Sequence, residues 1–499
     1  MSPKRLLIFI VAYNAEKNIE NVLQRIPPEM FRRTDLYTEV LVIDDSSSDS
    51  TFSTALRHET AGEIPVRVLV NPKNLGYGGN QKLGYHYALL NKFDYVALLH
   101  GDGQYAPECL PELIAPLVSG ESDAVFGSRM LNRASALRGG MPLYKFFGNI
   151  ILTTIQNFLS GAKLSEWHSG YRLYATSILA AIPFDRNSNN FDFDTDIIIQ
   201  LLRVKARIRE IPIPTYYGDE ICHVNGIPYG IRILLSCIQN RLQSLGLFYN
   251  RKFDVESDTL AHYQAKFHFP SSHSRALSWV QEGDKVLILG AGSPELVSPF
   301  VKKGCEVVAI ELELNQELES VCHKAIQGDL DTLDLRTTLA GMRFDKVLAL
   351  DVIEHLRSPE GFLERLCSTP ACKSARFLFT VPNVAFIATR VMLLLGFFNY
   401  GKRGILDRTH TRLFTFSSMT RALQQAGFEV THKEGIPAPL PLALPSAPRL
   451  AHLLTLLNMC AIRLWKGLFS FQILCQSTST PRLEELLDAT ERYSREVRA

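Results

Sequence analysis

Short apolar runs rich in β-branched residues alternate with longer segments of helical periodicity, and this alternation occurs twice along the chain. Such runs predict strands of a parallel sheet, because helices cover both faces of that sheet and its strands need not alternate polar and apolar residues. Two successive series predict two doubly wound α/β domains. The predicted strands are Leu6–Val11, Val40–Ile43, Val66–Val70, Tyr95–Leu99 and Ala124–Phe126, then Lys285–Leu289, Glu306–Ile310, Lys346–Leu350, Phe377–Val381 and an edge strand near Phe469–Leu474.

The length of the chain agrees with two domains. Its 499 residues exceed the roughly 300 at which single cores stop growing. We place a first domain at residues 1–248, a connector at 249–274, a second domain at 275–477 and a charged C-terminal helix at 478–499.

The charge balance excludes nucleic acid as a partner. The 53 Lys and Arg nearly cancel the 51 Asp and Glu, and no basic run is interleaved with aromatic residues. The nine cysteines include no Cys-x-x-Cys pair, which predicts a reduced, cytoplasmic chain without structural zinc.

No segment is predicted to cross a membrane, because charged residues interrupt the long apolar stretches. Two helical stretches, Leu143–Leu159 and Ile231–Leu247, fit either a helix lying on the inner membrane surface or a helix packed on a soluble core. Of these two interpretations we expect core packing, with peripheral membrane contact as the alternative.

Polar, mostly acidic side chains follow three strands of the first series. Ligands of open α/β sheets bind outside the carboxyl ends of the strands. A nucleotide sugar needs acceptors for its base and ribose, and a divalent cation with hard oxygen ligands for its diphosphate. The residues that follow the strands are Tyr13 and Glu16, then Asp44 and Asp45, then His100, Asp102 and Gln104.

Five motifs occur in order on these predicted elements: Ala12–Glu16, Asp44–Thr51, Asn74–Gly79, Gly101–Gln104, and Gly127–Arg129 with Ser169–Arg172 downstream. On these motifs the first roughly 250 residues resemble the inverting family 2 glycosyltransferases of GT-A-type fold, particularly the dolichyl-phosphate mannose or glucose synthase branch. The resemblance implies transfer of a hexose from a UDP- or GDP-sugar.

The resemblance also implies roles for individual residues. Tyr13, Glu16 and Asp44 would contact base and ribose, with Asp45 and Gly76 at the same donor site. Asp102 and Gln104 would hold Mg²⁺ or Mn²⁺. Arg129 and Arg172 would face phosphate, which a guanidinium binds bidentately.

One position departs from the family pattern, because the first acid of the Asp-x-Asp metal motif is His100 here. A neutral imidazole ligates Mn²⁺ better than Mg²⁺, which favours Mn²⁺. The acceptor stays open: a glycan hydroxyl needs a general base, for which Asp192, Asp194 and Asp196 are candidates, whereas a polyprenyl phosphate needs none. Acidic residues at a helix start are equally explained by the helix dipole.

The second series begins with a strand, a Gly290-x-Gly292 turn and a helix start at Ser293 and Pro294. Glu311 ends the next strand, in position for ribose hydroxyls. Alone, this pattern suits a dinucleotide as well as S-adenosylmethionine.

Further motifs follow from Arg275 onward: Gln327–Asp329, Phe344–Val347, Leu350–Leu356, Val381–Asn383 and Leu406–His410. On these, about 200 residues resemble the class I S-adenosylmethionine-dependent methyltransferases, a Rossmann-like fold. The resemblance implies that Glu311 and Asp329 bracket ribose and adenine, that Gly290 and Gly292 face the methionine end, and that Asp351 lies at the cofactor site. Ile288 and Pro294 depart from the pattern. Base candidates for methyl transfer to a hydroxyl are His355, Asp407 and His410.

These patterns predict a bifunctional enzyme that transfers a sugar to a glycan or lipid-linked acceptor and O-methylates a saccharide. A first alternative is a polyprenyl-phosphate glycosyltransferase at the membrane surface with an accessory methyltransferase. A second is that one half is a degenerate, non-catalytic binding module.

Overall fold

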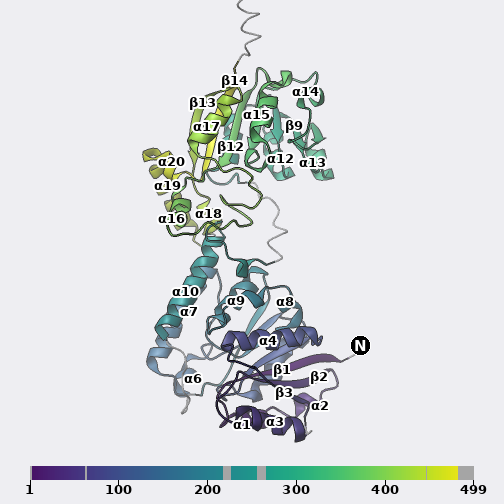
Figure 1. Ribbon diagram of the computed structural model, residues 1–499, viewed down its shortest axis with the longest axis vertical. Helices are drawn as coiled ribbons and strands as arrows, with labels where there is room; N and C mark the ends of the chain where they lie inside the picture. Colours follow the sequence, from purple (N-terminus) through teal and green to yellow (C-terminus); the bar gives the residue numbers. More distant parts are fainter. Residues whose placement is uncertain are drawn as a thin grey trace, which may run out of the picture. The chain divides into compact units, whose positions relative to one another are not determined.

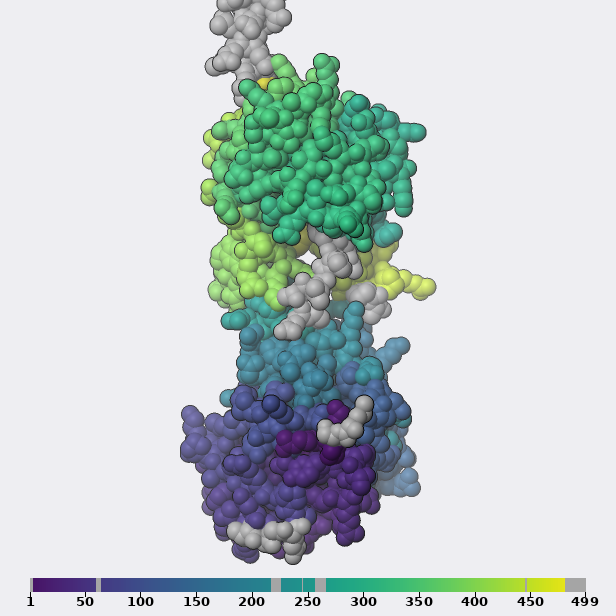
Figure 2. Space-filling model, turned by 90° about the vertical axis from the view of Figure 1, so that its right-hand side faces the viewer, coloured from purple at the N-terminus to yellow at the C-terminus, as the bar shows by residue number. Residues whose placement is uncertain are grey.

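The computed structural model describes residues 3–61, 64–216, 226–244, 246–255, 266–444 and 447–480. The chain divides into two compact units, residues 1–241 with 250–260, and residues 242–249 with 261–499. Figures 1 and 2 colour the chain from purple at its N-terminus to yellow at its C-terminus. The predicted charged helix at the C-terminus falls, from residue 481 on, outside the described residues.

The first unit is built on a seven-stranded sheet with the order β3-β2-β1-β4-β6-β5-β7. All five predicted strands are present and point the same way, as expected for a doubly wound sheet. The prediction missed two strands, of which β6 runs antiparallel to β4 and β5. The strands are β1 Lys4–Ala12, β2 Leu36–Asp44, β3 Val66–Val70, β4 Tyr95–His100, β5 Ala124–Ser128, β6 Arg172–Ala175 and β7 Ile208–Pro212.

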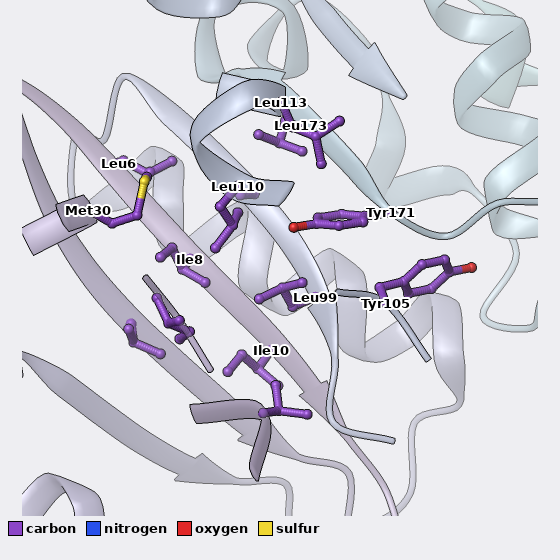
Figure 3. Close-up of a cluster of buried hydrophobic side chains, with 14 of the residues drawn as sticks. Leu6, Ile8, Ile10, Met30, Leu99, Tyr105, Leu110, Leu113, Tyr171 and Leu173 are labelled. Carbon is purple, nitrogen blue, oxygen red and sulfur yellow. The ribbon is translucent and has the colours of Figure 1, made fainter. Parts of the chain in front are cut away.

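Both faces of this sheet are covered, which is why its strands read as continuous apolar runs. On one face Leu6, Ile8 and Ile10 of β1 pack with residues of α5, as Figure 3 shows. On the other face Phe9 packs against α4 so closely that a Cβ added to Gly84 would lie 2.1 Å from its ring. The close approach of α4 fixes the helix that carries Gly76 at its N-terminal cap.

The helices of the first unit are α1 Ile19–Gln24, α2 Glu29–Arg32, α3 Thr51–Ala61, α4 Tyr77–Leu90, η1 Pro107–Cys109, α5 Leu110–Val118, α6 Arg133–Arg138, α7 Leu143–Ser160, α8 Thr176–Ala180, η2 Phe184–Arg186, α9 Phe193–Arg203, α10 Gly226–Gln243 and η3 Arg251–Phe253.

The second unit repeats the architecture with the strand order β10-β9-β8-β11-β12-β14-β13. The prediction of an edge strand near Phe469–Leu474 is wrong in position and in role. Strand β14 begins at Gln472, lies inside the sheet, and runs antiparallel to β12 and β13. The two edges of this sheet are β10 and β13, and both are absent from the predicted strands. Strand β13 escaped because its solvated side gives it a mostly polar sequence. The strands are β8 Lys285–Leu289, β9 Glu306–Glu311, β10 Lys324–Gln327, β11 Lys346–Leu350, β12 Arg376–Pro382, β13 Phe428–Ile436 and β14 Gln472–Ser479.

The helices of the second unit are α11 Ser272–Trp279, α12 Pro294–Lys302, α13 Gln316–Val321, α14 Leu335–Thr338, η5 Ile353–His355, α15 Pro359–Cys367, η6 Pro370–Cys372, α16 Ile387–Leu394, α17 Phe416–Gln425, α18 Leu440–Ala443, α19 Pro448–Leu464 and α20 Lys466–Phe469. Within the described part of the chain, no helix combines the length and apolar content needed to cross a membrane.

Candidate active sites

The acidic residues of the first unit meet at one edge of its sheet. Strands β2 and β4 flank β1 in parallel, with Ala12 opposite Asp44 and Val11 opposite His100. The turn that carries Asp102 therefore follows a strand whose carboxyl end lies beside those of β1 and β2. Asp44 and Asp102 therefore lie at the same edge of the sheet, as a single donor site requires.

The two aspartates at the end of β2, Asp44 and Asp45, have different hydrogen-bond partners. Asp45 is buried, and its carboxylate accepts from the Asn71 side-chain amide (2.7 Å), the Leu75 amide (2.8 Å) and the Gly76 amide (2.9 Å). It therefore fixes the start of α4. The carboxylate of Asp44 accepts from the Ser47 hydroxyl, and burial raises its pKa. Of the two, Asp44 is better placed to receive a ligand hydroxyl.

The loop after β1 is locked to the loop after β2. Asn14 adopts a left-handed φ of +49°, and its side-chain oxygen accepts from the Ser48 amide at 2.9 Å. Glu16 accepts from the Ser50 amide at 3.2 Å. These bonds hold Glu16 in one place and leave the ring of Tyr13 exposed beside it, where it can stack on a base.

His100 belongs to a hydrogen-bonded chain. Its Nε2 lies 3.2 Å from the Tyr77 hydroxyl, and that hydroxyl donates to the Asp194 carboxylate at 3.0 Å. A hydroxyl has one hydrogen, so Tyr77 must accept from a protonated Nε2 of His100. Burial lowers the pKa of His100 and favours this neutral form. Metal binding by His100 stays a prediction, and it would use Nδ1 or displace Tyr77.

Asp102 caps the turn that it begins. Its Oδ1 accepts from the amide of Gln104 at 3.0 Å, and its side chain is only half buried. This arrangement holds the carboxylate at the sheet edge, as a metal ligand requires. Asp102 and Gln104 therefore fit the predicted cation, and their role stays a prediction.

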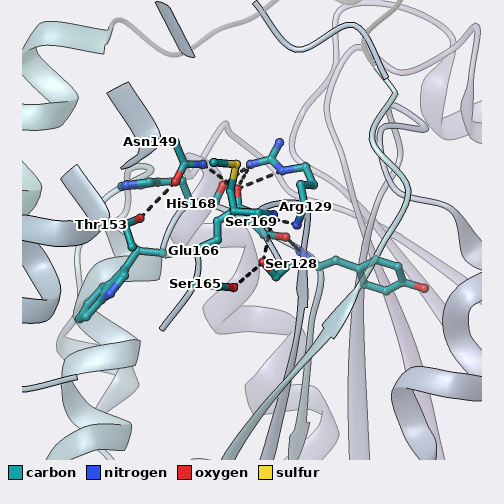
Figure 4. A network of polar contacts seen from close by, with 12 residues as sticks. Ser128, Arg129, Asn149, Thr153, Ser165, Glu166, His168 and Ser169 are labelled. Atoms are coloured by element: carbon teal, nitrogen blue, oxygen red, sulfur yellow. Dashed lines mark hydrogen bonds and ion pairs between the residues drawn. The ribbon is translucent and has the colours of Figure 1, made fainter. Parts of the chain in front are cut away.

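Arg129 lies in a buried network around Glu166 (Figure 4). Its guanidinium pairs with the Glu166 carboxylate, which also accepts from Asn149 of α7 at 2.8 Å. Burial opposes ionisation of Glu166, but the charge of Arg129 outweighs it and holds the pKa of that carboxyl below its usual range. Burial lowers the pKa of nearby His168 to about 4. A phosphate contact of Arg129 would share the guanidinium with Glu166.

Arg172 lies deeper than the prediction of a phosphate contact requires. It is 1% exposed, and its nitrogens donate to the carbonyls of Ser169, Asp194 and Trp167 at 2.8 to 3.1 Å. Here its guanidinium holds the loop before β6 against α9. Its contact with phosphate stays a prediction, whereas its structural role is visible.

The acidic start of α9 is divided among different partners. Asp194 receives Tyr77 and lies 3.9 Å from Arg172, whereas Asp196 accepts from Ser236 and Lys252, both at 2.8 Å. Asp192 lies 3.3 Å from Arg232 of α10. Of the three candidate bases, Asp194 alone belongs to the chain that reaches His100.

Helix α7 buries mainly polar side chains and exposes apolar ones, the reverse of the pattern expected for a helix in water. Apart from Phe146, the side chains that it buries are polar: Asn149 bonds Glu166, Thr153 bonds Asn149, and Gln156 bonds Thr195. Most of its apolar side chains face outward, whereas Phe146 and Ile150 form a small cluster and Leu159 packs on the core. The helix therefore packs on its domain mainly through polar side chains, and peripheral membrane contact stays a prediction. The exposed apolar residues are Leu143, Tyr144, Phe147, Ile151, Ile155 and Phe158 on α7, with Ile227, Ile231, Leu235 and Ile238 on α10.

In the second unit the glycine turn meets the acidic strand end. The amide of Gly292 donates to Glu311 Oε2 at 2.7 Å. Gly290 and Gly292 have φ of +67° and +63°, which other residues rarely adopt. Ser293 is the N-cap of α12 as predicted, but its hydroxyl makes no capping bond and is buried without a partner. The turn therefore keeps an unused donor beside the predicted cofactor site.

Asp329 and Asp351 follow the next strands of this sheet. Asp329 caps its own turn by accepting from the Asp331 amide at 2.9 Å. Asp351 has a left-handed φ of +56° and accepts from Thr380 at 2.9 Å and from Gln472 at 2.6 Å. Backbone strain at a non-glycine residue is typical of functional sites. The left-handed conformation of Asp351 changes the direction of the chain after β11.

The methyltransfer candidates His355 and His410 lie together, with ring centres 4.8 Å apart. A third residue, Glu354, joins them: one ligand atom of each of the three lies within 4.8 Å of the others. Asp407 instead accepts from Thr409 in its own turn.

Comparison with known proteins identifies the family that each of the two domains matches. Residues 7–182 match the family model Glycosyl transferase family 2, and residues 260–433 match the model Methyltransferase domain. The chain therefore carries a family 2 glycosyltransferase domain at its N-terminus and a methyltransferase domain at its C-terminus. Each domain is therefore that of an enzyme, as the sequence predicted.

Three relatives are similar to the glycosyltransferase domain. UDP-N-acetylglucosamine–dolichyl-phosphate N-acetylglucosaminyltransferase of Methanococcus voltae is 27% identical over 44% of this chain and 88% of its own. A low-salt glycan biosynthesis hexosyltransferase of Haloferax volcanii is 31% identical over 40% of this chain and 44% of its own. Polyprenol monophosphomannose synthase of Mycolicibacterium smegmatis is 24% identical over 42% and 77%.

Three residues of these candidate sites were not predicted from the sequence. Tyr77 lies within the motif Asn74–Gly79, but the motif gave no role to its hydroxyl, whose contacts with His100 and Asp194 are seen only in the structure. Glu166 lies between β5 and β6 outside the quoted motifs, and its pairing with Arg129 is seen only in the structure. Glu354 adjoins His355 in a quoted motif, and that adjacency was a usable signal for a metal-type cluster.

Proposed function

We propose that the glycosyltransferase domain transfers a sugar from a UDP- or GDP-sugar to a polyprenyl phosphate at a membrane surface, with Mn²⁺ or Mg²⁺. The methyltransferase domain then uses S-adenosylmethionine to O-methylate a saccharide. The observation that carries the choice of acceptor is the outward apolar face of α7. An aqueous protein gains nothing from this arrangement, whereas a helix lying at a lipid surface does.

The inner face of the same helix supports an anionic acceptor. Asn149 and Glu166 hold Arg129 on the polar side of α7, and His168 lies 2.9 Å from the Tyr229 hydroxyl of α10. A polyprenyl phosphate has a charged head and an apolar tail. Its head suits the arginine side of the helix pair, and its tail suits the outer side.

The donor end rests on Asp44 and Asp102 at the shared sheet edge. The cation would be held by Asp102 and Gln104, where it stabilises the diphosphate leaving group. Tyr13 and Glu16 would receive the base and ribose. These residues fit a nucleotide sugar because their loops are fixed to one another before any ligand arrives.

A phosphate acceptor also changes the role expected of Asp194. A lipid phosphate is already anionic and needs no general base. Asp194 is engaged by Tyr77 and lies near Arg172, so we assign it to positioning. The names of two relatives, a dolichyl-phosphate transferase and a polyprenol monophosphomannose synthase, agree with this acceptor.

In the methyltransferase domain, the contact of Gly292 with Glu311 fits S-adenosylmethionine. The positive φ values let main-chain amides approach the methionine end, and the Glu311 carboxylate keeps acceptor capacity for ribose hydroxyls. A saccharide is the acceptor we favour because one chain holds both domains, and their products then belong to one series of reactions.

The test is transfer by the full chain in a matrix of donors, metals and acceptors. UDP- and GDP-sugars are combined with Mn²⁺, Mg²⁺ or EDTA, and with polyprenyl phosphate, the unphosphorylated polyprenol or a soluble glycan. We expect labelled sugar in the organic phase only with polyprenyl phosphate and a metal. Asp102→Asn should lower turnover by roughly 100-fold or more. Equal transfer to the soluble glycan in the absence of lipid contradicts the proposal.

A further inference from the structure

A short turn after β11 and a distant loop bring three side chains together in a cluster to which the proposed function above assigns no contact. The turn is η5, Ile353–His355. The amides of Thr411 and Arg412 donate to the Glu354 carbonyl at 2.8 and 3.2 Å, which ties the loop carrying His410 to this turn. Glu354, His355 and His410 are thereby held together by main-chain bonds rather than by their side chains.

The carboxylate of Glu354 is buried without a protein group that would stabilise it. The residue is 1% exposed, and neither carboxylate oxygen has a hydrogen-bond partner. A buried carboxylate without partners is costly, and such groups in native proteins usually have an unseen ligand. Its oxygens lie within reach of the two imidazoles, with ligand atoms of all three residues inside 4.8 Å.

The two imidazoles are arranged as metal ligands are. His410 Nδ1 lies 2.9 Å from the Ile405 carbonyl, and His355 Nδ1 lies 3.3 Å from the Thr409 carbonyl. A carbonyl only accepts, so each Nδ1 carries the hydrogen, and each Nε2 of the neutral ring keeps a lone pair. Metal-bound histidines commonly donate their second nitrogen to a main-chain carbonyl in this way.

We propose that Glu354, His355 and His410 bind a divalent transition-metal ion such as Zn²⁺ or Mn²⁺. Two imidazole nitrogens and one carboxylate oxygen are a ligand set that such ions accept. Three protein ligands leave coordination positions open, and His355 is exposed, so a ligand in solution can reach them. This site is separate from the Asp102 cation site of the glycosyltransferase domain.

The position of the cluster suggests its use. A Cβ added to Gly290 would lie 2.6 Å from Val352, so the turn before Glu354 packs directly on the glycine turn of the cofactor site. Resting on the proposed methylation, we infer that the ion binds the acceptor hydroxyl and favours its alkoxide. The hydroxyl proton then passes to water, the new carbon–oxygen bond forms, and the carbon–sulfur bond of the sulfonium breaks.

The test measures metal binding rather than turnover. The full chain carrying Asp102→Asn, which removes the other expected cation site, is stripped with chelator and titrated with Zn²⁺ and Mn²⁺ by calorimetry. We expect one equivalent of metal and, with Co²⁺, visible absorption of a protein-bound ion. In this background, Glu354→Gln and His410→Ala should each weaken binding by roughly tenfold or more.

His432→Ala is the matched control, because His432 is an exposed histidine of β13 outside the cluster. If Glu354→Gln does not fold, the exposed His355→Ala gives the same comparison without disturbing the core. Absence of bound metal, or unchanged affinity in the His355 and His410 variants, overturns the metal site. Loss of methylation without metal binding would assign the histidines as bases. Metal binding without saccharide methylation would leave the site standing and refute the proposed methylation.

Discussion

The outward apolar face of α7 predicts membrane binding that can be lowered by a measurable factor. The perturbation is the double substitution Phe147→Ser with Ile151→Ser, two neighbours on the exposed stripe. In water these side chains are 57% and 58% exposed. Replacing them should therefore change the stability of the folded protein by less than about 1 kcal/mol, which separates the effect on lipid binding from an effect on folding.

The magnitude follows from the area that the lipid would cover. Full burial of a Phe or Ile side chain contributes about 1.5–3 kcal/mol. A little more than half of each side chain is available, so each contributes about 1 kcal/mol to membrane partitioning. The pair contributes about 2 kcal/mol, which corresponds to a roughly 30-fold lower partition coefficient.

The assay is flotation with vesicles of phosphatidylcholine and phosphatidylglycerol. Leu90→Ser on α4 is the control, because this leucine is 67% exposed but lies away from the α7 stripe. We expect the control to bind as the parent does and the α7 variant to be released. Raising the salt concentration should change this difference little, since it is apolar in origin. The reasoning is refuted if the parent ignores vesicles or if the variant and the control bind equally.

Two further predictions concern the methyltransferase domain. Glu311→Gln replaces an acceptor oxygen by a donor beside the Gly292 amide and should raise the Kd for S-adenosylmethionine by about 10- to 100-fold in calorimetry. Glu313→Gln changes an exposed acid two residues further on and should leave this Kd unchanged. Equal Kd values for the two variants would remove Glu311 from the cofactor site. Burial lowers the pKa of His273 to about 4 from 6.5, with Asp351 opposing and Lys266 assisting. The unfolded chain therefore binds a proton in the pH range where the folded chain does not, so stability is present above pH 6.5 and falls as the pH drops toward 4, by about 2 kcal/mol between pH 7.5 and 5. Denaturant unfolding of His273→Gln should lack this loss and that of the exposed His268→Gln should retain it, and parallel pH profiles for all three proteins would contradict the assignment.

Most of the strands that the sequence predicted correctly are buried on both faces, with the partly exposed edge strand β3 as an exception. Runs such as those of β1 and β8 contain apolar residues throughout, and their pattern does not depend on distant parts of the chain. Strand β13 escaped because its middle, Thr431–Glu434, is polar throughout and lies in an edge strand exposed to solvent. Strand β6 has four residues and includes Arg172, so its sequence lacks the usual signature of a buried strand.

The sites divide along similar lines. Residues that follow a strand in a recognisable motif, such as Asp44 and Gly292, could be placed because topology brings strand ends together. The different hydrogen-bond partners of neighbouring site residues could not be predicted in this way. Asp45 accepts hydrogen bonds at the start of α4, and Arg172 donates to main-chain carbonyls. Both arrangements depend on contacts between segments far apart in the sequence.

The orientation of α7 shows the same limit. Its apolar residues have helical spacing, and spacing alone is identical for a helix facing a core and one facing lipid. The difference lies in the buried partners Glu166 and Thr195, which come from other parts of the chain.

The insertion of β6 between β4 and β5 sets the width of the glycosyltransferase site. Neighbouring strands lie about 4.8 Å apart, so the end of β4 at His100 and the end of β5 before Arg129 are separated by two spacings, roughly 10 Å. Because β6 runs the other way, it begins at this edge instead of ending there. A sheet without it would bring the acidic strand ends and the arginine loop into direct contact, where their charges would neutralise each other. The reversed strand keeps them apart, and the loop that leads into it lies between them, with Gly170 directly against the ring of His100.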